Sequence, residues 1–522
     1  MSNGNGNSIA PNAKRLLWAG FMAILAAGVG FSVRGGILGQ WAEQFGFTMT
    51  ELGTITGGGL TGFGVVIIVT SLFADKIGYG KLLIGAFILH FISAVLTLAT
   101  PAFFASGGKD AAYWCLFTAM FIFAIGNGVC EAVVNPLVAT LFPTNKTHYL
   151  NILHAGWPAG LVLGGLASTF MAAKTDDVGK LIAAAVDWKI QMSLFLIPVI
   201  LYGVMLFGQR FPKSEAASAG VTIGQMISTL FAPLMLILLL LHALVGYVEL
   251  GTDSWISKIT GSIMASPQKG LMLFVYTSLL MFALRFVAGP IVHKISPLGL
   301  LCVSGVFGAT GLTMLGSAVG VVACVVAATV YALGKTFLWP TMLAVASERF
   351  PKGGAVAIGM MGGVGMLSAG LLGGPAIGYK QDYYASKNLQ QNAAETYDRY
   401  AVAEPKGFLF LPKIKGLDGA KVGVLGDQGK ELANIGVALA KEQRKDANHE
   451  ALAAWWTIAQ SSAAKDAAPV NAATLEGGRK ALAVTAAVPA AMAVLYLLLI
   501  LYFKAKGGYK QIHIHGASHE AK

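Results

Sequence analysis

The stretch LFADKIGYGKLL, residues 72–83, joins two apolar runs and has a second copy later in the chain. The copy, GPIVHKISPLGLL at residues 289–301, shares a small-residue helix end, a polar residue followed by lysine, and a tight turn into the next apolar run. A second pair of segments repeats in the same way, because NPLVATLFP (135–143) is matched by WPTMLAVASERFP (339–351). Repetition of this kind predicts two related halves, as in many membrane transporters.

The apolar runs around these segments are long enough to cross a membrane. Hydrophobic residues make up 55% of the 522 residues and charged residues only 12%, which is typical of a polytopic membrane protein. A helix of about 20 apolar residues crosses a hydrocarbon core of roughly 30 Å. We therefore predict an all-α membrane protein with twelve transmembrane helices, six in each half. The expected spans are 15–38, 52–74, 82–104, 113–140, 150–172, 188–210, 230–256, 270–292, 298–318, 320–346, 353–378 and 480–503.

Basic residues in the short loops predict the orientation. They are enriched on the side that carries both termini, which indicates that the N- and C-termini are cytoplasmic. The net charge of +12 is spread over many loops rather than collected on one face, so it indicates topology and attraction to anionic lipid rather than nucleic-acid binding. The first span is too long for a signal peptide and lacks a small-residue cleavage signal. We expect a monomer that spans the cell (inner) membrane several times.

The expected organisation follows from the spans. A cytoplasmic tail should precede the first half, a cytoplasmic linker should join the halves, and a long insertion should separate the last two helices on the outer side. The expected segments are 1–14 (N-terminal tail), 15–210 (N-terminal half), 211–229 (linker), 230–379 (helices 7–11), 380–479 (insertion), 480–503 (helix 12) and 504–522 (C-terminal tail).

The insertion, residues 380–479, has nearly balanced charge. Residues 430–460 have the pattern of one or two helices, and GFLFLPKIKG (407–416) that of a short extended piece. An ordered cap over the outer side is one interpretation. A disordered, alanine-rich insertion without a role in transport is the other.

The two copies of the connecting segment resemble a characteristic cytoplasmic loop of the major facilitator superfamily. The first copy matches its acid, basic and glycine positions, with Ser71 where glycine is usual. The second copy carries His293 where an acid is common. In that family such residues act as gates and inter-helix clamps on the cytoplasmic side and do not touch substrate. The resemblance implies gating roles for Asp75, Lys76, Gly78, Lys81 and Arg285.

Two further motifs are similar to the fucose/galactose:proton symporter branch of that superfamily. They are GNGVCEAVVNP (126–136), with Asn151 shortly after it, and GYVELGTDSW (246–255). In that branch the acid of the fourth span is a proton-coupling site, and nearby asparagines contact the sugar. The resemblance therefore implies that Glu131 carries the proton and that Asn135 and Asn151 contact a sugar.

The first span departs from that branch. The branch usually has an aspartate there, whereas FSVRGGILGQW (31–41) carries Arg34, like carboxylate-transporting members of the superfamily. Two substrates stay open as a result. A neutral monosaccharide is favoured by the motifs of spans 4 and 7, and a small organic anion, such as a sugar acid or monocarboxylate, is favoured by Arg34 and Lys335.

Intramembrane charges mark the candidate site independently of the resemblance. A lone ionised side chain at mid-membrane costs about 2.5 to 3.5 kcal/mol on insertion scales, so it should face a watery cavity or a partner. Spacings of three or four residues place these polar side chains on single helix faces. Transporters of this build bind substrate near the midplane between their halves. The candidate substrate-binding residues are Arg34, Asn127, Asn135, Asn151, His154, Trp157, Glu249, Tyr331, Lys335 and Trp339.

Each candidate has a structural alternative. Glu131 is either a proton carrier, because desolvation favours its neutral form, or a permanent salt-bridge partner of a basic residue that holds helices together. When substrate is absent, we expect Glu131 to pair with Arg34. Glu249 and Asp253 lie towards the outer end of their span and could simply be solvated. His154 could relay protons or only pack, and Trp157 and Trp339 could stack on a sugar or anchor the membrane interface.

Missing motifs exclude other functions. No GxxxxGK[ST] phosphate loop, no metal-ligand spacing within the spans and no nucleophile–base–orienter set can be found, so neither an ATP-driven pump nor an enzyme is expected, and no cofactor or metal is expected. We therefore predict a secondary active transporter that carries a small sugar with protons by alternating access. A proton-coupled carrier of a small organic anion is the alternative.

Overall fold

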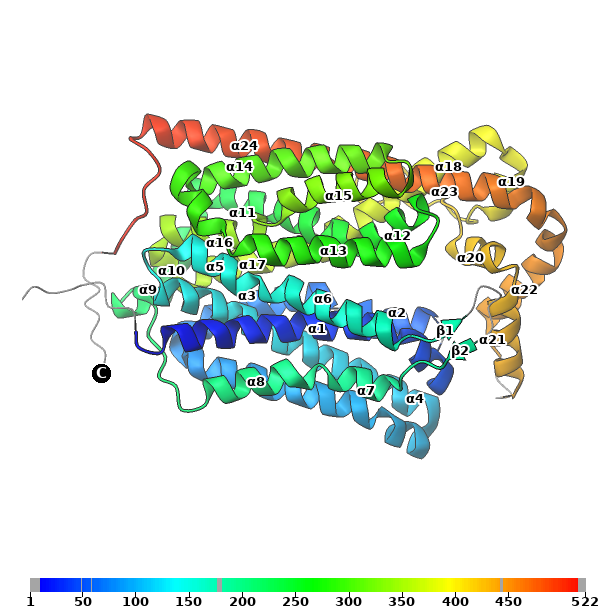
Figure 1. Ribbon diagram of the computed structural model, residues 1–522, viewed down its shortest axis with the longest axis horizontal. Helices are drawn as coiled ribbons and strands as arrows, with labels where there is room; N and C mark the ends of the chain where they lie inside the picture. The colour runs from blue at the N-terminus through cyan, green and yellow to red at the C-terminus, as the bar shows by residue number, and fades with distance from the viewer. Residues whose placement is uncertain (1–9, 48, 58, 176–180, 442–444, 515–522) are drawn as a thin grey trace, which may run out of the picture.

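The computed structural model describes residues 10–47, 49–57, 59–175, 181–441 and 445–514. Parts of both expected terminal tails, residues 1–9 and 515–522, lie outside this range. Long helices run side by side along one axis, and shorter helices extend beyond them at one end (Figure 1). The first helix begins and the last helix ends at the opposite end (Figure 1), which we call the termini end; the other is the cap end.

The N-terminal half contains most of the first two hundred residues. Gly78, with φ of 93°, turns the chain between the second and third passes. Its helices and strands are α1 (Ala13–Phe45), α2 (Met49–Gly57), α3 (Gly59–Ile77), α4 (Tyr79–Leu141), α5 (Lys146–His154), α6 (Gly156–Met171), β1 (Lys174–Thr175), β2 (Leu181–Ala183), α7 (Trp188–Ser193) and α8 (Leu196–Leu206), followed by the short linker helices α9 (Glu215–Ser218), α10 (Ile223–Ser228) and η1 (Thr229–Phe231).

Helix α4 is two membrane passes rather than one. Its 63 residues are interrupted at Gly108, whose φ of 68° and ψ of −158° reverse the chain direction. The two arms then lie antiparallel, since Ser93 Oγ donates a hydrogen bond to the Ala119 carbonyl (2.8 Å) and Cys115 Sγ to the Leu96 carbonyl (3.3 Å).

The C-terminal half repeats the same arrangement. Its elements are α11 (Pro233–Gly246), the π-helical turn η2 (Tyr247–Gly251), α12 (Thr252–Ile263), α13 (Pro267–Arg285), α14 (Ala288–Ser317), α15 (Gly320–Lys335), α16 (Leu338–Arg349), η3 (Pro351–Gly353), α17 (Gly354–Ser368), η4 (Ala369–Gly373), α18 (Gly374–Asn392), α23 (Ala463–Thr485) and α24 (Ala487–Ala505). Within the described residues, eleven helical segments are long and apolar enough to cross a membrane. With α4 counted as two, they give the twelve predicted passes.

The internal repeat is visible in the backbone. Gly78 (φ 93°, ψ 140°) and Ser296 (φ 64°, ψ 163°) occupy matching places in the two connecting segments, and both turn the chain into the next helix. Phe142 (φ −129°, ψ 63°) and Phe350 (φ −127°, ψ 57°) end the matching helices α4 and α16 with nearly the same geometry. The prediction of two related six-helix halves is therefore confirmed.

The two halves are joined at the termini end. Thr147 Oγ1 of α5 donates to the Glu348 carboxylate of α16 (3.0 Å), and Asn151 Nδ2 donates to Thr341 Oγ1 (3.2 Å). Tight packing of α16 and α17 against the N-terminal half leaves Met342, Leu343 and their neighbours without solvent exposure.

Residues 507–514, which we call the C-terminal strap, cross this same junction. Tyr509 donates a hydrogen bond to the second Glu348 oxygen (2.7 Å), and the backbone N–H of Ile512 donates to the Glu348 carbonyl (2.9 Å). Gln511 Nε2 donates to the carbonyl of Pro143 in the N-terminal half (2.7 Å). The strap thus contacts both halves.

The insertion forms a compact cap with its own core. It contains α19 (Ala394–Tyr400), α20 (Gly419–Asp427), α21 (Lys430–Lys441), α22 (Ala447–Ala459) and η5 (Gln460–Ser462) between α18 and α23. Leu389, Tyr400 and Val470 are fully buried in this core, beside an ion pair between Arg399 and Asp466 (2.6 Å). The prediction of one or two helices within 430–460 is met by α21 and α22. In the piece expected to be extended, 407–416, Ile414 forms an antiparallel bridge with Lys406.

The expected insertion boundaries fall inside helices. α18 continues through residue 380 and α23 through residue 479, and the two pack against each other along their length. The hydropathy pattern marks where the apolar part of a helix ends, not where the helix itself ends. The described residues of this segment form helices with a shared core, which contradicts the alternative of a disordered insertion.

Candidate functional site

A small cavity lies between the halves, midway along the bundle. It has about 30 Å³ of open space, enough for a water molecule. Its lining residues come from α1, α3, α4, α5 and α6 on one side and from η2, α13, α16 and α17 on the other. They are Ala23, Ile24, Ala27, Phe63, Asn127, Cys130, Glu131, His154, Trp157, Glu249, Leu250, Arg285, Trp339 and Met366.

Glu131 faces this cavity and is held by its neighbour one helical turn away. Asn135 Nδ2 donates to the Glu131 carboxylate (2.7 Å), while Asn135 Oδ1 lies 2.7 Å from His154 Nε2. Because the amide nitrogen is used for Glu131, the amide oxygen must accept from His154, which assigns the ring proton to Nε2. His154 Nδ1 is then left as an acceptor.

Asn127, one turn before Glu131, is oriented by a residue that the sequence did not single out. His90 Nε2 lies 3.0 Å from Asn127 Oδ1, and His90 Nδ1 lies 2.9 Å from the Tyr202 hydroxyl. The amide oxygen can only accept, so His90 donates to it and accepts from Tyr202. The amide nitrogen of Asn127 is thereby left as a donor for the cavity.

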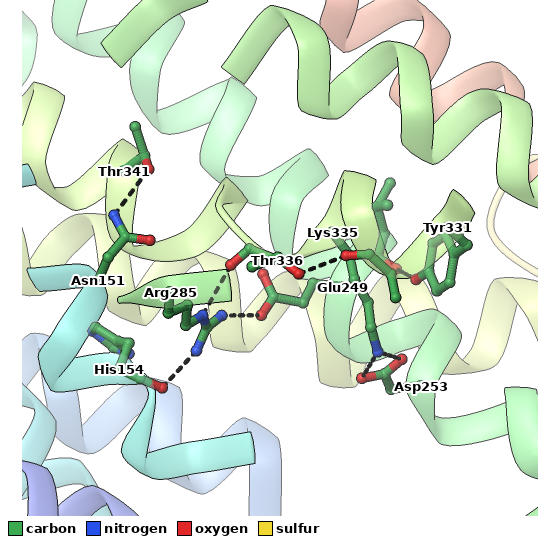
Figure 2. A network of polar contacts seen from close by, with 11 residues as sticks. Asn151, His154, Glu249, Asp253, Arg285, Tyr331, Lys335, Thr336 and Thr341 are labelled. Carbon is green, nitrogen blue, oxygen red and sulfur yellow. Dashed lines mark hydrogen bonds and ion pairs between the residues drawn. The ribbon is translucent and has the colours of Figure 1, made fainter. Parts of the chain in front are cut away.

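Arg285 spans the two halves at the centre of the bundle (Figure 2). Its Nη2 donates to Glu249 Oε1 (3.0 Å) and its Nε to the Thr336 carbonyl (2.9 Å), both in its own half. Its Nη1 donates to the His154 carbonyl in the other half (2.5 Å). The resemblance to a cytoplasmic loop implied a gate at that loop, whereas the structure places Arg285 in the cavity.

Both carbonyls that Arg285 contacts are released by prolines. A proline has no N–H, so the carbonyl four residues before it loses its helical hydrogen bond. Pro158 stands four residues after His154, and Pro340 four residues after Thr336. The helices break at these places, since α5 ends at His154 and α15 at Lys335. Arg285 thus supplies the donors that two broken helices lack.

A second ion pair lies beside this network (Figure 2). Lys335 Nζ contacts both carboxylate oxygens of Asp253, at 2.5 and 2.7 Å, and Tyr331 donates to the Val248 carbonyl (2.7 Å). Lys335 and Tyr331 are fully buried and do not line the cavity. The alternative that Glu249 and Asp253 are solvated is wrong, because each is paired with a cation inside the bundle.

Arg34 lies away from the cavity, and the expected pair with Glu131 is wrong. Its guanidinium donates to Ser93 Oγ (3.0 Å) and to the Gly30 carbonyl (3.2 Å), and it lies 3.9 Å from the centre of the Phe123 ring. The side chain therefore packs between α1, both arms of α4 and the ring of Phe195, just before α8 (5.0 Å to the ring centre). Helical spacing gives the face of a residue but not whether that face meets the cavity or a neighbouring helix.

The remaining predicted residues lie in two places, the cavity and the junction of the halves. Trp157 and Trp339 line the cavity, and Trp339 packs against the buried ring of His242 (4.6 Å between centres). Asn151 lies at the junction of the halves rather than in the cavity.

The other four residues with implied gating roles, Asp75, Lys76, Gly78 and Lys81, lie near the termini end. An Asp75 carboxylate oxygen lies next to Gly354, where α17 begins, so the first connecting segment reaches the other half. Lys76 and Lys81 are exposed.

Twelve membrane helices in two related halves, with a polar cavity between them, define a membrane transporter. A family model described as the Major Facilitator Superfamily matches residues 20–374. The chain belongs to the major facilitator superfamily. Among curated proteins, none matches the sequence significantly.

Solved structures share this fold at low sequence identity. The transporter FucP in its outward conformation is 16% identical over 72% of this chain and 93% of its own, with a TM-score of 0.58. The proton:xylose symporter XylE bound to 6-bromo-6-deoxy-D-glucose is 13% identical over 74% of this chain and 91% of its own (TM-score 0.56). A bacterial homologue of the human lysosomal transporter Spinster, inward-facing, is 14% identical over 96% and 100% (TM-score 0.60).

Proposed function

We propose that this protein is a secondary active transporter that carries a small sugar together with a proton. The observation that carries the proposal is Glu131, a carboxyl on the cavity wall whose hydrogen-bond partner is the neutral amide of Asn135. A carboxyl without a cation in contact, in a desolvated place, can take up and release a proton as its surroundings change.

The charges around the cavity favour a neutral substrate. Arg285 is paired with Glu249, and Lys335 with Asp253, so both cations near the cavity already have a carboxylate partner. Arg34 packs elsewhere. An organic anion would have to compete with a carboxylate of the protein for its cation. A neutral substrate, bound while Glu131 is protonated, would leave the charges around the cavity balanced. The organic-anion alternative therefore has no supporting observation at this site.

The uncharged part of the lining suits a sugar. Trp157 and Trp339 offer aromatic faces from the two halves, and Asn127 offers an oriented N–H donor. Mixed aromatic and hydrogen-bonding walls are typical of small-molecule sites. Two solved structures with this fold are also named as sugar carriers, FucP as the E. coli fucose:proton symporter and XylE as a proton:xylose symporter.

Transport requires the cavity to enlarge. Its present volume, about 30 Å³, admits a water molecule but no monosaccharide. The contacts of Thr147 with Glu348 and of Asn151 with Thr341 close the termini end, which is cytoplasmic in the proposed orientation. Alternating access would break these contacts when the termini end opens.

Proton coupling is tested by Glu131→Gln in proteoliposomes. We expect the variant to lose accumulation driven by an inward proton gradient, because the amide cannot exchange a proton. Counterflow of labelled sugar, which needs no net proton movement, should persist. A panel of labelled monosaccharides and monocarboxylates identifies the substrate, and Glu395→Gln, in the exposed part of the cap, is the matched control. Unchanged accumulation by Glu131→Gln would refute the proposed role of this residue.

A further inference from the structure

We propose that Arg285 is a positioning residue that couples the charge state of the cavity carboxylates to the stability of two helix breaks, one in each half. The inference rests on the proposed function only in taking Glu131 as the proton-exchanging group. It adds a mechanical link between that proton and the movement of the halves.

The first step of the argument is the pair of proline breaks. Pro158 frees the His154 carbonyl in the N-terminal half, and Pro340 frees the Thr336 carbonyl in the C-terminal half. Arg285 donates to both, through Nη1 and Nε. A buried carbonyl without a donor is unfavourable, so each break is stable only where a donor is supplied. One side chain therefore stabilises the bent form of both helices.

The second step is the position of the carboxylates around the guanidinium. Glu249 holds Nη2 from the C-terminal half, and Glu131 lines the same cavity from the N-terminal half. An ionised Glu131 attracts Arg285 towards the N-terminal half and so supports its contact with the His154 carbonyl. A protonated Glu131 removes that attraction and leaves Arg285 with Glu249. The bend between α5 and α6 then loses support when the proton binds.

Other titratable and charged groups surround Arg285. They are Asp253 on α12, paired with Lys335 on α15, and His154 on α5 and His242 on α11. The Asp253–Lys335 pair is internally neutral. His154 Nε2 is committed to Asn135, and His242 packs against Trp339, so the carboxylates of Glu131 and Glu249 are the groups whose charge acts directly on the guanidinium.

A merely structural ion pair makes a different prediction. If Arg285 served only to neutralise Glu249, then removing both charges together in Arg285→Gln/Glu249→Gln would restore normal behaviour. If Arg285 also links Glu131 to the helix breaks, the double variant should fold but should not respond to protonation of Glu131.

The test measures the separation of the halves at the termini end without substrate. Spin labels are attached at Lys81→Cys and Lys294→Cys, two exposed lysines in matching segments of the two halves. The background carries alanine at Cys115, Cys130, Cys302 and Cys324. Distances are measured by pulsed electron paramagnetic resonance at pH 5.5 and pH 8.5. We expect the distance to lengthen at the lower pH in the unmodified network and to stay constant in Arg285→Gln/Glu249→Gln.

A second variant tests the carbonyl contacts while Arg285 stays in place. Pro158→Ala/Pro340→Ala restores both missing N–H donors, so the two carbonyls can bond within their own helices. We expect this variant to fold and to lose the pH response. A preserved response in either variant, or no response in the unmodified network, overturns the inference. Because no sugar is present, failure of sugar uptake would contradict the proposed substrate and leave this inference standing.

Discussion

Arg34 is a buried cation that acts as part of the helix packing. It contacts Phe123 through its guanidinium face and Ser93 through a hydrogen bond, with 1% of its surface exposed. These contacts join α1 to both arms of α4. The chemistry of an arginine in a transporter is therefore decided by its neighbours and not by its presence in a membrane helix.

We predict that Arg34→Gln lowers stability and leaves transport specificity unchanged. Loss of the cation–π contact and of one hydrogen bond should cost about 1 to 3 kcal/mol. The measurements are thermal unfolding in detergent and the pH profile and affinity of sugar counterflow, with Arg15→Gln on the exposed start of α1 as the control. Weaker affinity at unchanged stability would contradict the packing role.

Residue-scale features of the site were partly predictable from the sequence. The four-residue spacing of Asn127, Glu131 and Asn135 correctly indicated one shared face, because that spacing is a property of the helix. His90 was missed because its contact with Asn127 depends on how the arms of α4 fold back at Gly108. Arg285 was assigned to the cytoplasmic loop because the second copy of the connecting segment begins only four residues after it, at Gly289.

At the scale of elements, α18 and α23 are parts of the bundle that reach beyond it. Lys380 on α18 donates hydrogen bonds to Tyr247 (3.0 Å) and to Thr485 of α23 (3.1 Å). These bonds tie the base of the cap to the seventh pass and to the last pair of helices. We therefore expect that the cap can be deleted without harm to the bundle only if the ends of α18 and α23 that carry these bonds are kept.

We predict that replacing residues 393–462 by a short Gly/Ser linker preserves the twelve-helix bundle. Flexible loops cost little when they close a short gap, and the deleted helices pack on the ends of α18 and α23, at Leu389 and Val470, beyond the bundle. Replacing the whole of 380–479 should instead lower the melting temperature, since it removes the paired ends of α18 and α23. Expression, melting and uptake of both deletions check this; equal stability of the two would contradict it.

The ends of the helices show which features a hydropathy pattern can predict and which it cannot. The expected spans match the helices to within a few residues at most ends, because the apolar length is set by the membrane. The pattern is silent about helix that continues into water, as in α18 and α23. It is also silent about breaks inside a span, although Pro158 and Pro340 marked them in the sequence.

At the scale of the whole molecule, two halves pack against each other, α3 against α17 and α6 against α13, and enclose a small cavity. The internal repeat was sufficient to predict the halves. Their relative position was not predictable, since a transporter uses the same sequence in several conformations that differ by only a few kcal/mol. Which end is closed therefore depends on contacts such as Thr147 with Glu348, formed between residues about 200 positions apart.

We predict that truncation after Lys506 favours conformations that are open at the termini end. The truncation removes the hydrogen bond of Gln511 to Pro143 in the N-terminal half, and those of Tyr509 and Ile512 to Glu348, which hold the strap at the junction. The spin-label pair at positions 81 and 294 should report a larger population of long distances at every pH. Tyr509→Phe, which removes a single hydroxyl, should produce a smaller shift in the same direction, and an unchanged distribution in both would show that the strap is passive.

The strap also offers an optical signal of turnover. In the proposed alternating-access cycle, opening of the termini end would separate Gln511 from Pro143, so His513 would pass from a protein surface to open water once in each cycle. An environment-sensitive dye at His513→Cys would brighten and dim with that exchange, in single molecules as well as in vesicles. The frequency of its blinking would count transport events one by one, without a labelled substrate.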